Sequence, residues 1–210
     1  MQEVKEAHTS GGLRGILEIS FFHNLWQHVS GVERAKRNIV REYVKPFPAA
    51  RILDIGCGTG VLLDYIKEKV DYVGFDINGD YIEHAKKKYG ARGKFYCTSV
   101  NDSYVEEKNF DIAIAIGILH HLDDSESEKL ISSAHRCLKA GGCFVMAEPV
   151  WTSRQGKLEK YLMKKDRGQN IREEKAYLGL LSKYFPRTES AVRSGMLNIP
   201  WTLSITKSFS

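Results

Sequence analysis

Short apolar runs and longer amphipathic stretches alternate along the middle of the chain. The short runs are rich in Val, Ile and aromatic residues and predict strands at residues 51–55, 72–76, 94–98, 111–117 and 143–147. Apolar residues at helical spacing fill the gaps and predict helices at residues 60–69, 80–89 and 125–138. This alternation predicts a parallel sheet with helices on both faces, and the run that follows Asp111 carries no charge, so it should lie centrally.

The pattern changes on either side of this region. Before it, residues 31–44 predict an amphipathic helix that Pro46 and Pro48 end, and an aromatic-rich segment precedes that helix at residues 16–29. After it, the pattern predicts a polar and basic stretch, a helix and two closing strands, at residues 151–172, 173–184, 187–193 and 199–208. A sheet of about seven strands that ends in a hairpin results.

The first strand runs into a loop with three glycines at alternate positions. Residues 51–60 read Arg-Ile-Leu-Asp-Ile-Gly-Cys-Gly-Thr-Gly. Glycine is needed where a backbone adopts positive φ or lies against a ligand, and the predicted helix that follows offers free N–H groups to an anion. The loop therefore predicts a cofactor site. A dinucleotide is disfavoured, because its G-x-G-x-x-G fingerprint requires a glycine where Val61 stands.

Size and composition narrow the class of protein. The chain has 210 residues, 42% of them hydrophobic and 27% charged, which is ordinary for one globular domain. The N-terminus lacks the apolar core of a signal peptide, and the longest nearly apolar run, residues 112–119, is far shorter than the roughly 20 residues of a membrane helix. We therefore expect a cytoplasmic protein without a membrane span.

Cysteine usage and charge exclude further classes. The four cysteines contain no C-x-x-C pair, so they predict neither a zinc site nor a disulfide framework, and no metal is expected. The net charge of +5 is modest, and no block of like charge exceeds residues 86–88. Nucleic acid is therefore not expected as a partner, whereas an acidic small substrate or headgroup stays open.

Four motifs, in order, resemble those of the class I S-adenosylmethionine-dependent methyltransferases. They are Ile-Leu-Asp-Ile-Gly-Cys-Gly-Thr-Gly at the first strand, Tyr-Val-Gly-Phe-Asp-Ile-Asn at the second, Phe-Asp-Ile-Ala-Ile-Ala-Ile-Gly-Ile-Leu-His-His-Leu-Asp at the fourth and Leu-Lys-Ala-Gly-Gly-Cys-Phe at the fifth. The resemblance spans about residues 36–150. It implies a doubly wound, Rossmann-like α/β sheet of seven strands, mostly parallel with an antiparallel last strand, and S-adenosyl-L-methionine as cofactor.

The chain then divides into three parts of one methyltransferase domain. Residues 1–48 form an N-terminal helical segment that covers the sheet edge or the pocket, residues 49–150 the cofactor-binding core, and residues 151–210 the substrate side and the closing hairpin. The aromatic side chains of the first part could cover the cofactor or an apolar acceptor, although their helical spacing favours core packing; they are Phe21, Phe22, Trp26 and Tyr43.

The cofactor is expected at the carboxyl ends of the first two strands. Asp54 can accept a hydrogen bond from its amino group, directly or through water, and Asp76 can accept from both ribose hydroxyls. The alternative is that both carboxylates only cap turns. The family usually has an acidic residue after the third strand, where this chain has Ser99, with Asp102 nearby. The cofactor-binding residues that the resemblance implies are Asp54, Gly56, Cys57, Gly58, Gly60, Asp76, Ile77, Ser99, Val100 and Ile116.

His120 and His121 follow the fourth strand at the same edge of the sheet. Histidine is the natural general base near neutral pH, so one of the pair could take a proton from a hydroxyl or amine acceptor. The alternative is that both bond to loop backbone and serve only the structure. The chain has no Asn-Pro-Pro-Tyr type motif at this point, which disfavours methylation of nucleobase or amide nitrogen.

The acceptor is expected under the basic stretch at residues 151–172, with Trp151, Arg167 and Arg172 as candidate substrate contacts. Arginine suits carboxylate or phosphate, whereas the lysines of this stretch are better explained as a solvated face. The predicted function is methylation of a small molecule at oxygen, carbon or nitrogen by a monomer or homodimer. The rivals are a catalytically silent cofactor-binding module and a nicotinamide-dependent oxidoreductase, the second disfavoured by Val61.

Overall fold

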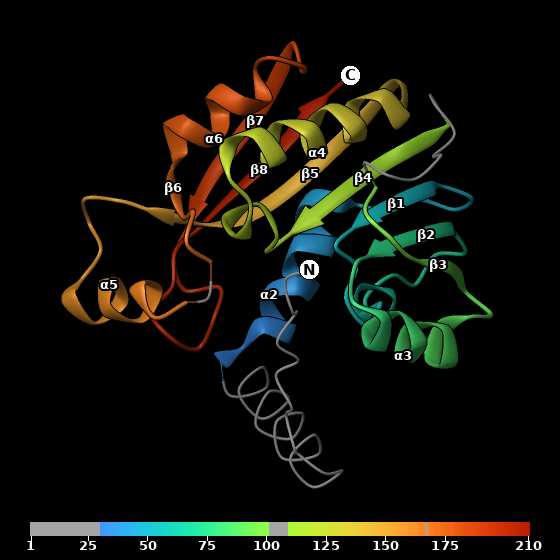
Figure 1. Ribbon diagram of the computed structural model, residues 1–210, viewed down its shortest axis with the longest axis horizontal. Helices are drawn as coiled ribbons and strands as arrows, with labels where there is room; N and C mark the ends of the chain where they lie inside the picture. Colours follow the sequence, from blue (N-terminus) through green and yellow to red (C-terminus); the bar gives the residue numbers. More distant parts are fainter. Residues whose placement is uncertain (1–29, 101–108, 167) are drawn as a thin grey trace, which may run out of the picture.

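A single mixed sheet organises the computed structural model, which describes residues 30–100, 109–166 and 168–210 (Figure 1). Seven strands hydrogen-bond side by side in the order β3-β2-β1-β4-β5-β8-β7, and the short β6 pairs with β5 off this path. The strands are β1 (Arg51–Ile55), β2 (Asp71–Asp76), β3 (Gly93–Cys97), β4 (Phe110–Ile116), β5 (Leu138–Trp151), β6 (Arg172–Glu173), β7 (Arg187–Arg193) and β8 (Leu203–Phe209). As predicted, β4 is the middle strand of the seven.

Strand directions confirm the predicted fold class. Strands β1 to β5 pair in parallel, with registers such as Asp54 opposite Gly74 and Ile114 opposite Val145. The last strand, β8, lies between β5 and β7 and is antiparallel to both. Because β1, β2, β4 and β5 are parallel, their carboxyl ends meet at one edge of the sheet, where ligands bind in such folds.

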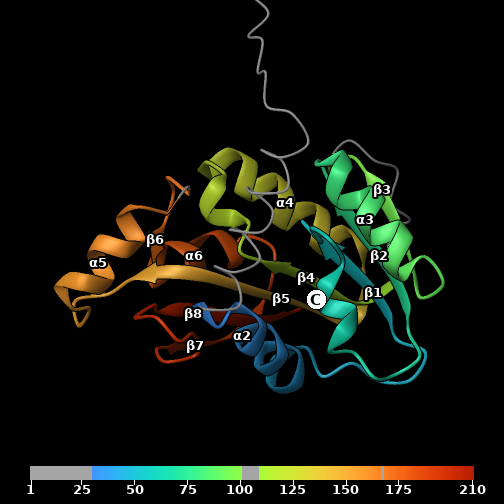
Figure 2. The same ribbon diagram turned by 90° about the horizontal axis from the view of Figure 1, so that it is seen from below.

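Two apolar layers cover the two faces of the sheet. One face packs against α2 (Val32–Ile39) and α3 (Gly79–Tyr89), and the other against α4 (Asp124–Cys137) and α6 (Glu174–Leu181). Successive side chains of a strand point to opposite faces of the sheet: Ile112 and Ile114 of β4 face the first layer, and Ala113 and Ala115 face the second. Figure 2 shows α2 and α4 on opposite sides of β5.

The predicted N-terminal helix begins at Val32, and Gly31 is its N-cap in a left-handed conformation with φ 78°. It continues beyond Ile39 as a π-helical turn, Val40–Val44. The Arg34 guanidinium donates to the backbone oxygens of Gly195, Met196 and Leu197 and so ties α2 to the segment before β8. The aromatic-rich segment at residues 16–29, with Phe21, Phe22 and Trp26, lies outside the described residues.

The helix predicted at residues 60–69 is wrong in extent. Only a 3₁₀ turn forms there, Val61–Asp64. Arg92 explains the early end, because its guanidinium donates to the backbone oxygens of Leu63 at 2.8 Å and Ile66 at 2.6 Å. A longer helix would use these oxygens for amides four residues further on. The helix N-terminus that was expected to hold an anion is therefore reduced to one short turn.

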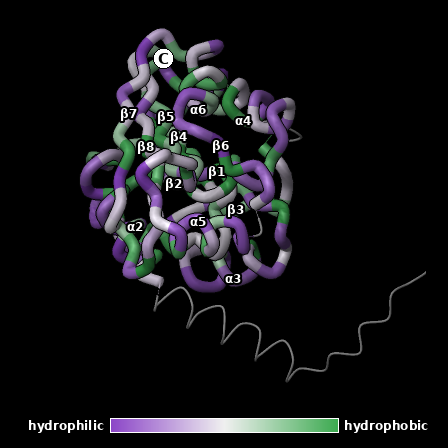
Figure 3. Tube along the Cα trace, turned by 90° about the vertical axis from the view of Figure 1, so that its left-hand side faces the viewer, coloured by the Kyte–Doolittle hydropathy of each residue, from purple (hydrophilic) through white to green (hydrophobic). Residues whose placement is uncertain are grey.

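The other predicted elements differ only at their ends, apart from the additional helix α5 (Lys157–Lys164) and strand β6. Hydrophobic residues concentrate on the inner strands, whereas α3 is mostly hydrophilic along its outer side (Figure 3). Across the described residues, none of the helices combines the length and the apolar character that a bilayer crossing requires.

Candidate active site at the carboxyl edge of the sheet

The glycine loop closes tightly over the end of β2. The amides of Gly56 and Cys57 both donate to the backbone oxygen of Phe75, at 2.8 and 3.0 Å. Gly56, Gly58 and Gly60 have φ values of 74°, 54° and 75°, which other residues rarely adopt. Apart from Gly58 and its two chain neighbours, no described atom lies within 4 Å of the position that a Cβ on Gly58 would occupy. The loop therefore offers open space at its tip, which fits a ligand lying against bare backbone.

The same loop touches the segment that follows β4. A Cβ on Gly56 would overlap the side chain of Ile118, whose Cδ1 is the nearest atom. Gly56 thus allows a close approach as well as a positive φ. The glycine loop and the histidine pair, predicted from separate motifs, therefore meet at one edge of the sheet.

Asp76 lies at the rim of this space. Its Oδ2 accepts from the amide of Gly58 at 2.8 Å and its Oδ1 from the amide of Asn78 at 2.9 Å. Each oxygen keeps a further lone pair, so the carboxylate can still accept from two hydroxyl groups. Ile77 beside it is 79% exposed, an unusual position for a large apolar side chain. This arrangement fits a ribose on Asp76 and an adenine against Ile77.

Asp54 is almost completely buried and accepts a hydrogen bond from the Tyr72 hydroxyl. Burial raises the pKa of Asp54 to about 6, although the hydrogen bond from Tyr72 and the charge of Lys36 oppose that rise. Burial also lowers the pKa of Lys36. A buried carboxylate whose negative charge is only partly compensated favours a cation beside it, such as the ammonium group of a methionine moiety.

The remaining residues that were predicted to bind the cofactor are buried or half-buried around the glycine loop and the strand ends. Cys57 is buried beneath the loop with its Sγ against Gly74, and Val100 is part of the core. Gly60 is buried, with the rings of Tyr89 and Phe95 close to it. Ser99 and Ile116 are half-buried. The cofactor roles of all these residues stay predictions.

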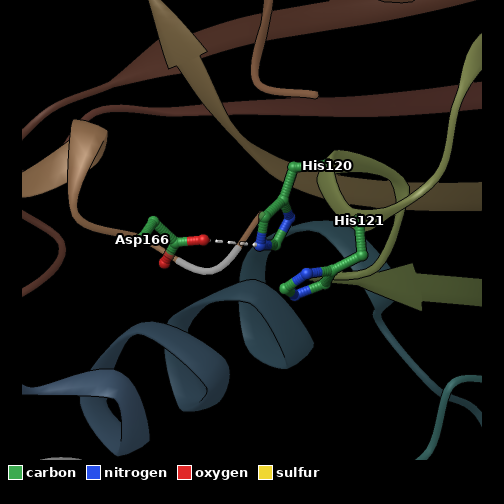
Figure 4. A group of neighbouring side chains, drawn as sticks. All are labelled: His120, His121 and Asp166. Carbon is green, nitrogen blue, oxygen red and sulfur yellow. Dashed lines mark ion pairs between the residues drawn. The ribbon is translucent and has the colours of Figure 1, made fainter. Parts of the chain in front are cut away.

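His120 is the centre of a buried polar group at the ends of β4 and β5 (Figure 4). Its Nδ1 lies 2.6 Å from Oε2 of Glu148, and its Nε2 lies 3.4 Å from Oδ1 of Asp166. Glu148 is fully buried, and its Oε1 accepts from the amides of Ile118 and Leu119, both at 2.9 Å. One carboxylate thus orients both the 3₁₀ turn Leu119–His121 and the imidazole.

Electrostatics determine what His120 can do. Burial alone would lower its pKa, but hydrogen bonds and negative charge from Asp166 and Glu148 raise the pKa of His120 to about 9. Burial would likewise raise the pKa of Asp166, but the hydrogen bonds from His120 and Gly168 hold it below its ordinary value. His120 is therefore an imidazolium at neutral pH and has no lone pair for a substrate proton. His121 is exposed, and its ring centroid lies 4.0 Å from that of His120.

The loop after α5 wraps around His120. The Asn170 amide donates to the His120 backbone oxygen at 2.9 Å, and the Gly168 amide donates to Asp166 at 2.7 Å. A Cβ on Gly168 would overlap the His120 ring. The loop therefore requires glycine at this position because backbone and imidazole are in contact.

Arg172 clamps this loop to the turn after β4. Its five N–H donors reach the Asp124 carboxylate, the Ser127 hydroxyl and the backbone oxygens of Leu119, Leu122 and Asn170. All of its donors are thus used within the protein, so we assign Arg172 to positioning the loop and no longer expect it to bind an acceptor. Arg167 lies outside the described residues, and Trp151 is half-buried at the end of β5, where it pairs with Glu173.

Sequence reasoning missed Glu148, Asp166 and Tyr72. Glu148 had a signal in the sequence, since it directly follows the apolar run predicted as a strand at residues 143–147, and an acid buried there needs a partner. Asp166 had none, because only the folded loop brings it to His120.

The fold and the edge of the sheet together define a class. A seven-stranded path with an antiparallel last strand, a glycine loop after β1 and an acid at the end of β2 are the features of class I S-adenosylmethionine-dependent methyltransferases. The sequence profile of the family described as "Methyltransferase domain" matches residues 52–142. Residues 52–142 therefore carry the methyltransferase domain of this class, whose cofactor is S-adenosylmethionine.

Curated relatives are similar to this chain in sequence, and solved structures are similar to it in fold. A human protein named "Probable tRNA methyltransferase 9B" is 30% identical over 145 residues, which are 66% of this chain and 31% of that protein. A ubiquinone/menaquinone biosynthesis C-methyltransferase from Geotalea daltonii is 31% identical over 128 residues, 56% of this chain and 53% of that protein. The solved structure of an S-adenosylmethionine-dependent methyltransferase from Methanosarcina mazei has a TM-score of 0.64 at 22% identity and covers 81% of this chain and 96% of that one.

The chain spans only part of these curated relatives, about a third of the human protein and about half of the bacterial one. Their names concern different acceptors, and the likeness to the solved structure concerns the fold alone. The relatives therefore support the class and leave the acceptor open.

Proposed function

We propose that this protein transfers a methyl group from S-adenosylmethionine to a small-molecule acceptor bound beside His120 and His121. The observation that carries the proposal is the contact between Gly56 and Ile118, which joins the donor loop to the turn that holds His120. Donor and acceptor would thus meet at the carboxyl edge of β1 and β4.

The chemistry requires position more than a reactive side chain. Bound S-adenosylmethionine supplies an electrophilic methyl group, and the acceptor atom must approach it in line and near contact. Asp54 would hold the cofactor's ammonium group, Asp76 its ribose hydroxyls, and the bare backbone of Gly58 would lie against it. Two observations support these assignments: Asp54 is buried, and each carboxylate oxygen of Asp76 keeps a lone pair for a hydroxyl group.

His120 would orient the acceptor side and would not act as the base. Its pKa of about 9 keeps it protonated near neutral pH. If the acceptor loses a proton, His121 or solvent would take it, because His121 lies at the exposed rim. Recognition of an anionic acceptor has less support than the basic residues at 151–172 suggested, because Arg172 uses its hydrogen-bond donors within the protein.

An acceptor screen tests the proposal. The full chain is incubated with methyl-labelled cofactor and separate pools of quinols, phenols, amines and carboxylic acids, with transcribed RNA as a further pool. We expect label in a small-molecule pool together with release of S-adenosylhomocysteine. Label in RNA alone would overturn the acceptor class, and tight S-adenosylhomocysteine binding without transfer to any pool would support a silent binding module.

Calorimetry separates the cofactor from its rival. Binding of S-adenosylmethionine or S-adenosylhomocysteine and none of NAD(H) is expected. The reverse result would replace the methyltransferase proposal by oxidoreduction.

A further inference from the structure

His120, His121 and Asp166 bring two imidazoles and a carboxylate together in the part of the chain that the structure describes. One ligand atom from each lies within 4.8 Å of the others. Figure 4 shows His120 and Asp166 facing one another, with His121 on the neighbouring side. The histidines come from the turn after β4 and Asp166 from the turn after α5, so the fold assembles the group from distant segments.

The spacing of these atoms suits a metal ion. The Nε2 of His120 and the Oδ1 of Asp166 are 3.4 Å apart. Two ligands with bonds of about 2.0 to 2.1 Å to a tetrahedral zinc ion lie about 3.4 Å apart. His121 is exposed, so a change in its side-chain angles can shorten the remaining separations.

The orientation of the His120 ring is held by a carboxylate, as is usual for a histidine that binds a metal ion. Glu148 holds Nδ1 at 2.6 Å and is itself held by the amides of Ile118 and Leu119. A buried carboxylate on one ring nitrogen directs the other nitrogen toward the ion. Asp166 is fixed in turn by the amide of Gly168, which donates to Oδ1 at 2.7 Å, and that oxygen keeps a second lone pair for the ion.

We propose that His120, His121 and Asp166 bind one divalent first-row transition metal ion of the zinc type, with a coordination position open to solvent. Two imidazoles and one carboxylate favour such ions over Mg²⁺ or Ca²⁺, which prefer oxygen ligands. The ion would replace the proton on Nε2 of His120 and release it to solvent. With the ion bound, neither histidine is free to act as a base, so solvent would take any proton that the acceptor loses. The open position is indicated by the exposed His121 and the partly exposed Asp166 side chain.

Zinc titration tests this proposal. The full, untagged chain is stripped with a chelator, and a Cys97→Ser background removes an exposed thiol that could compete for zinc. Calorimetry with Zn²⁺ should show one saturable site that excess Mg²⁺ does not displace. His121→Ala and Asp166→Asn should each weaken binding about tenfold or more. His84→Ala, an exposed histidine on α3, is the matched control and should leave the affinity unchanged.

A second measurement reports the ligands directly. One equivalent of Co²⁺ should give the visible absorption of a tetrahedral site in the parent protein and a weaker one in His121→Ala. Zinc affinity that is equal in the parent, His121→Ala and Asp166→Asn proteins, or no saturable binding, would overturn the proposal.

Cofactor binding by the same samples separates this inference from the proposed function. Retained S-adenosylhomocysteine binding in the variants shows that the fold is intact. A protein that binds zinc but not S-adenosylhomocysteine would refute the methyltransferase proposal and leave the metal site standing.

Discussion

Replacing Asp54 by Asn should stabilise the folded protein near neutral pH while weakening cofactor binding. Asp54 is buried, and burial raises its pKa from 3.8 to about 6. The folded state therefore favours the neutral carboxyl group, which Asn imitates. Because the folded pKa lies above the unfolded one, the stability from protonated Asp54 is fully present below pH 3.8 and is lost as the pH rises to about 6.

The magnitude follows from the two pKa values. The difference corresponds to about 3 kcal/mol at about 1.4 kcal/mol per pH unit, which is an order-of-magnitude figure. Between pH 4 and pH 7 the free energy of unfolding of Asp54→Asn should rise relative to the parent by roughly 2 kcal/mol. Other carboxyl groups titrate in both proteins and cancel in this comparison.

Urea denaturation of both proteins at several pH values measures this difference. Calorimetry with S-adenosylhomocysteine at pH 7 should show the opposite effect on binding, because the neutral amide attracts an ammonium group less than a carboxylate does. A stability difference that does not change with pH would refute the reasoning about burial. Unchanged cofactor affinity would refute the ammonium assignment.

Three further predictions concern the loops of the site. Asp76→Ala should raise the dissociation constant for S-adenosylhomocysteine about tenfold or more in calorimetry, with the exposed Asp80→Ala as control; equal effects would remove the ribose assignment. Gly56→Ala should lower the free energy of unfolding by about 1 to 3 kcal/mol, because φ is 74° and the new Cβ overlaps Ile118. Gly179→Ala should instead raise it by up to about 1 kcal/mol, because this glycine lies in helix α6 with space for a Cβ. Urea denaturation that ranks the two variants the other way would contradict this geometry. Arg172→Lys should lower the melting temperature by several degrees and raise the KM for the acceptor, with cofactor affinity kept, and an unchanged melting temperature would exclude the clamp.

The positions of the glycine loop and of the acid at the end of β2 could be predicted because their sequence signals are local. The strand, the glycines and the acid at the end of the next strand each follow from short sequence patterns, and parallel pairing then brings their ends together. The extent of the helix at residues 60–69 could not be predicted in the same way. Its end depends on Arg92, which arrives from the loop before β3.

The acceptor side depends on contacts between distant residues. The basic pattern at residues 151–172 indicated Arg172 as an anion ligand, whereas in the structure its guanidinium donates to the Asp124 carboxylate and to the backbone oxygen of Leu119. The histidine pair was visible in the sequence, whereas its protonation was not. That property depends on Glu148 and Asp166, which the fold brings to the two nitrogens of one ring.

One chain of contacts joins the two sides. Gly56 in the donor loop lies against Ile118, the Ile118 amide donates to Glu148 at 2.9 Å, and Glu148 holds His120 at 2.6 Å. A side chain at position 56 would overlap the side chain of Ile118, the residue whose amide donates to the buried carboxylate. If the proposed sites are right, the absence of a side chain at Gly56 matters to both, because it lets the glycine loop lie against the residue that precedes the turn of His120.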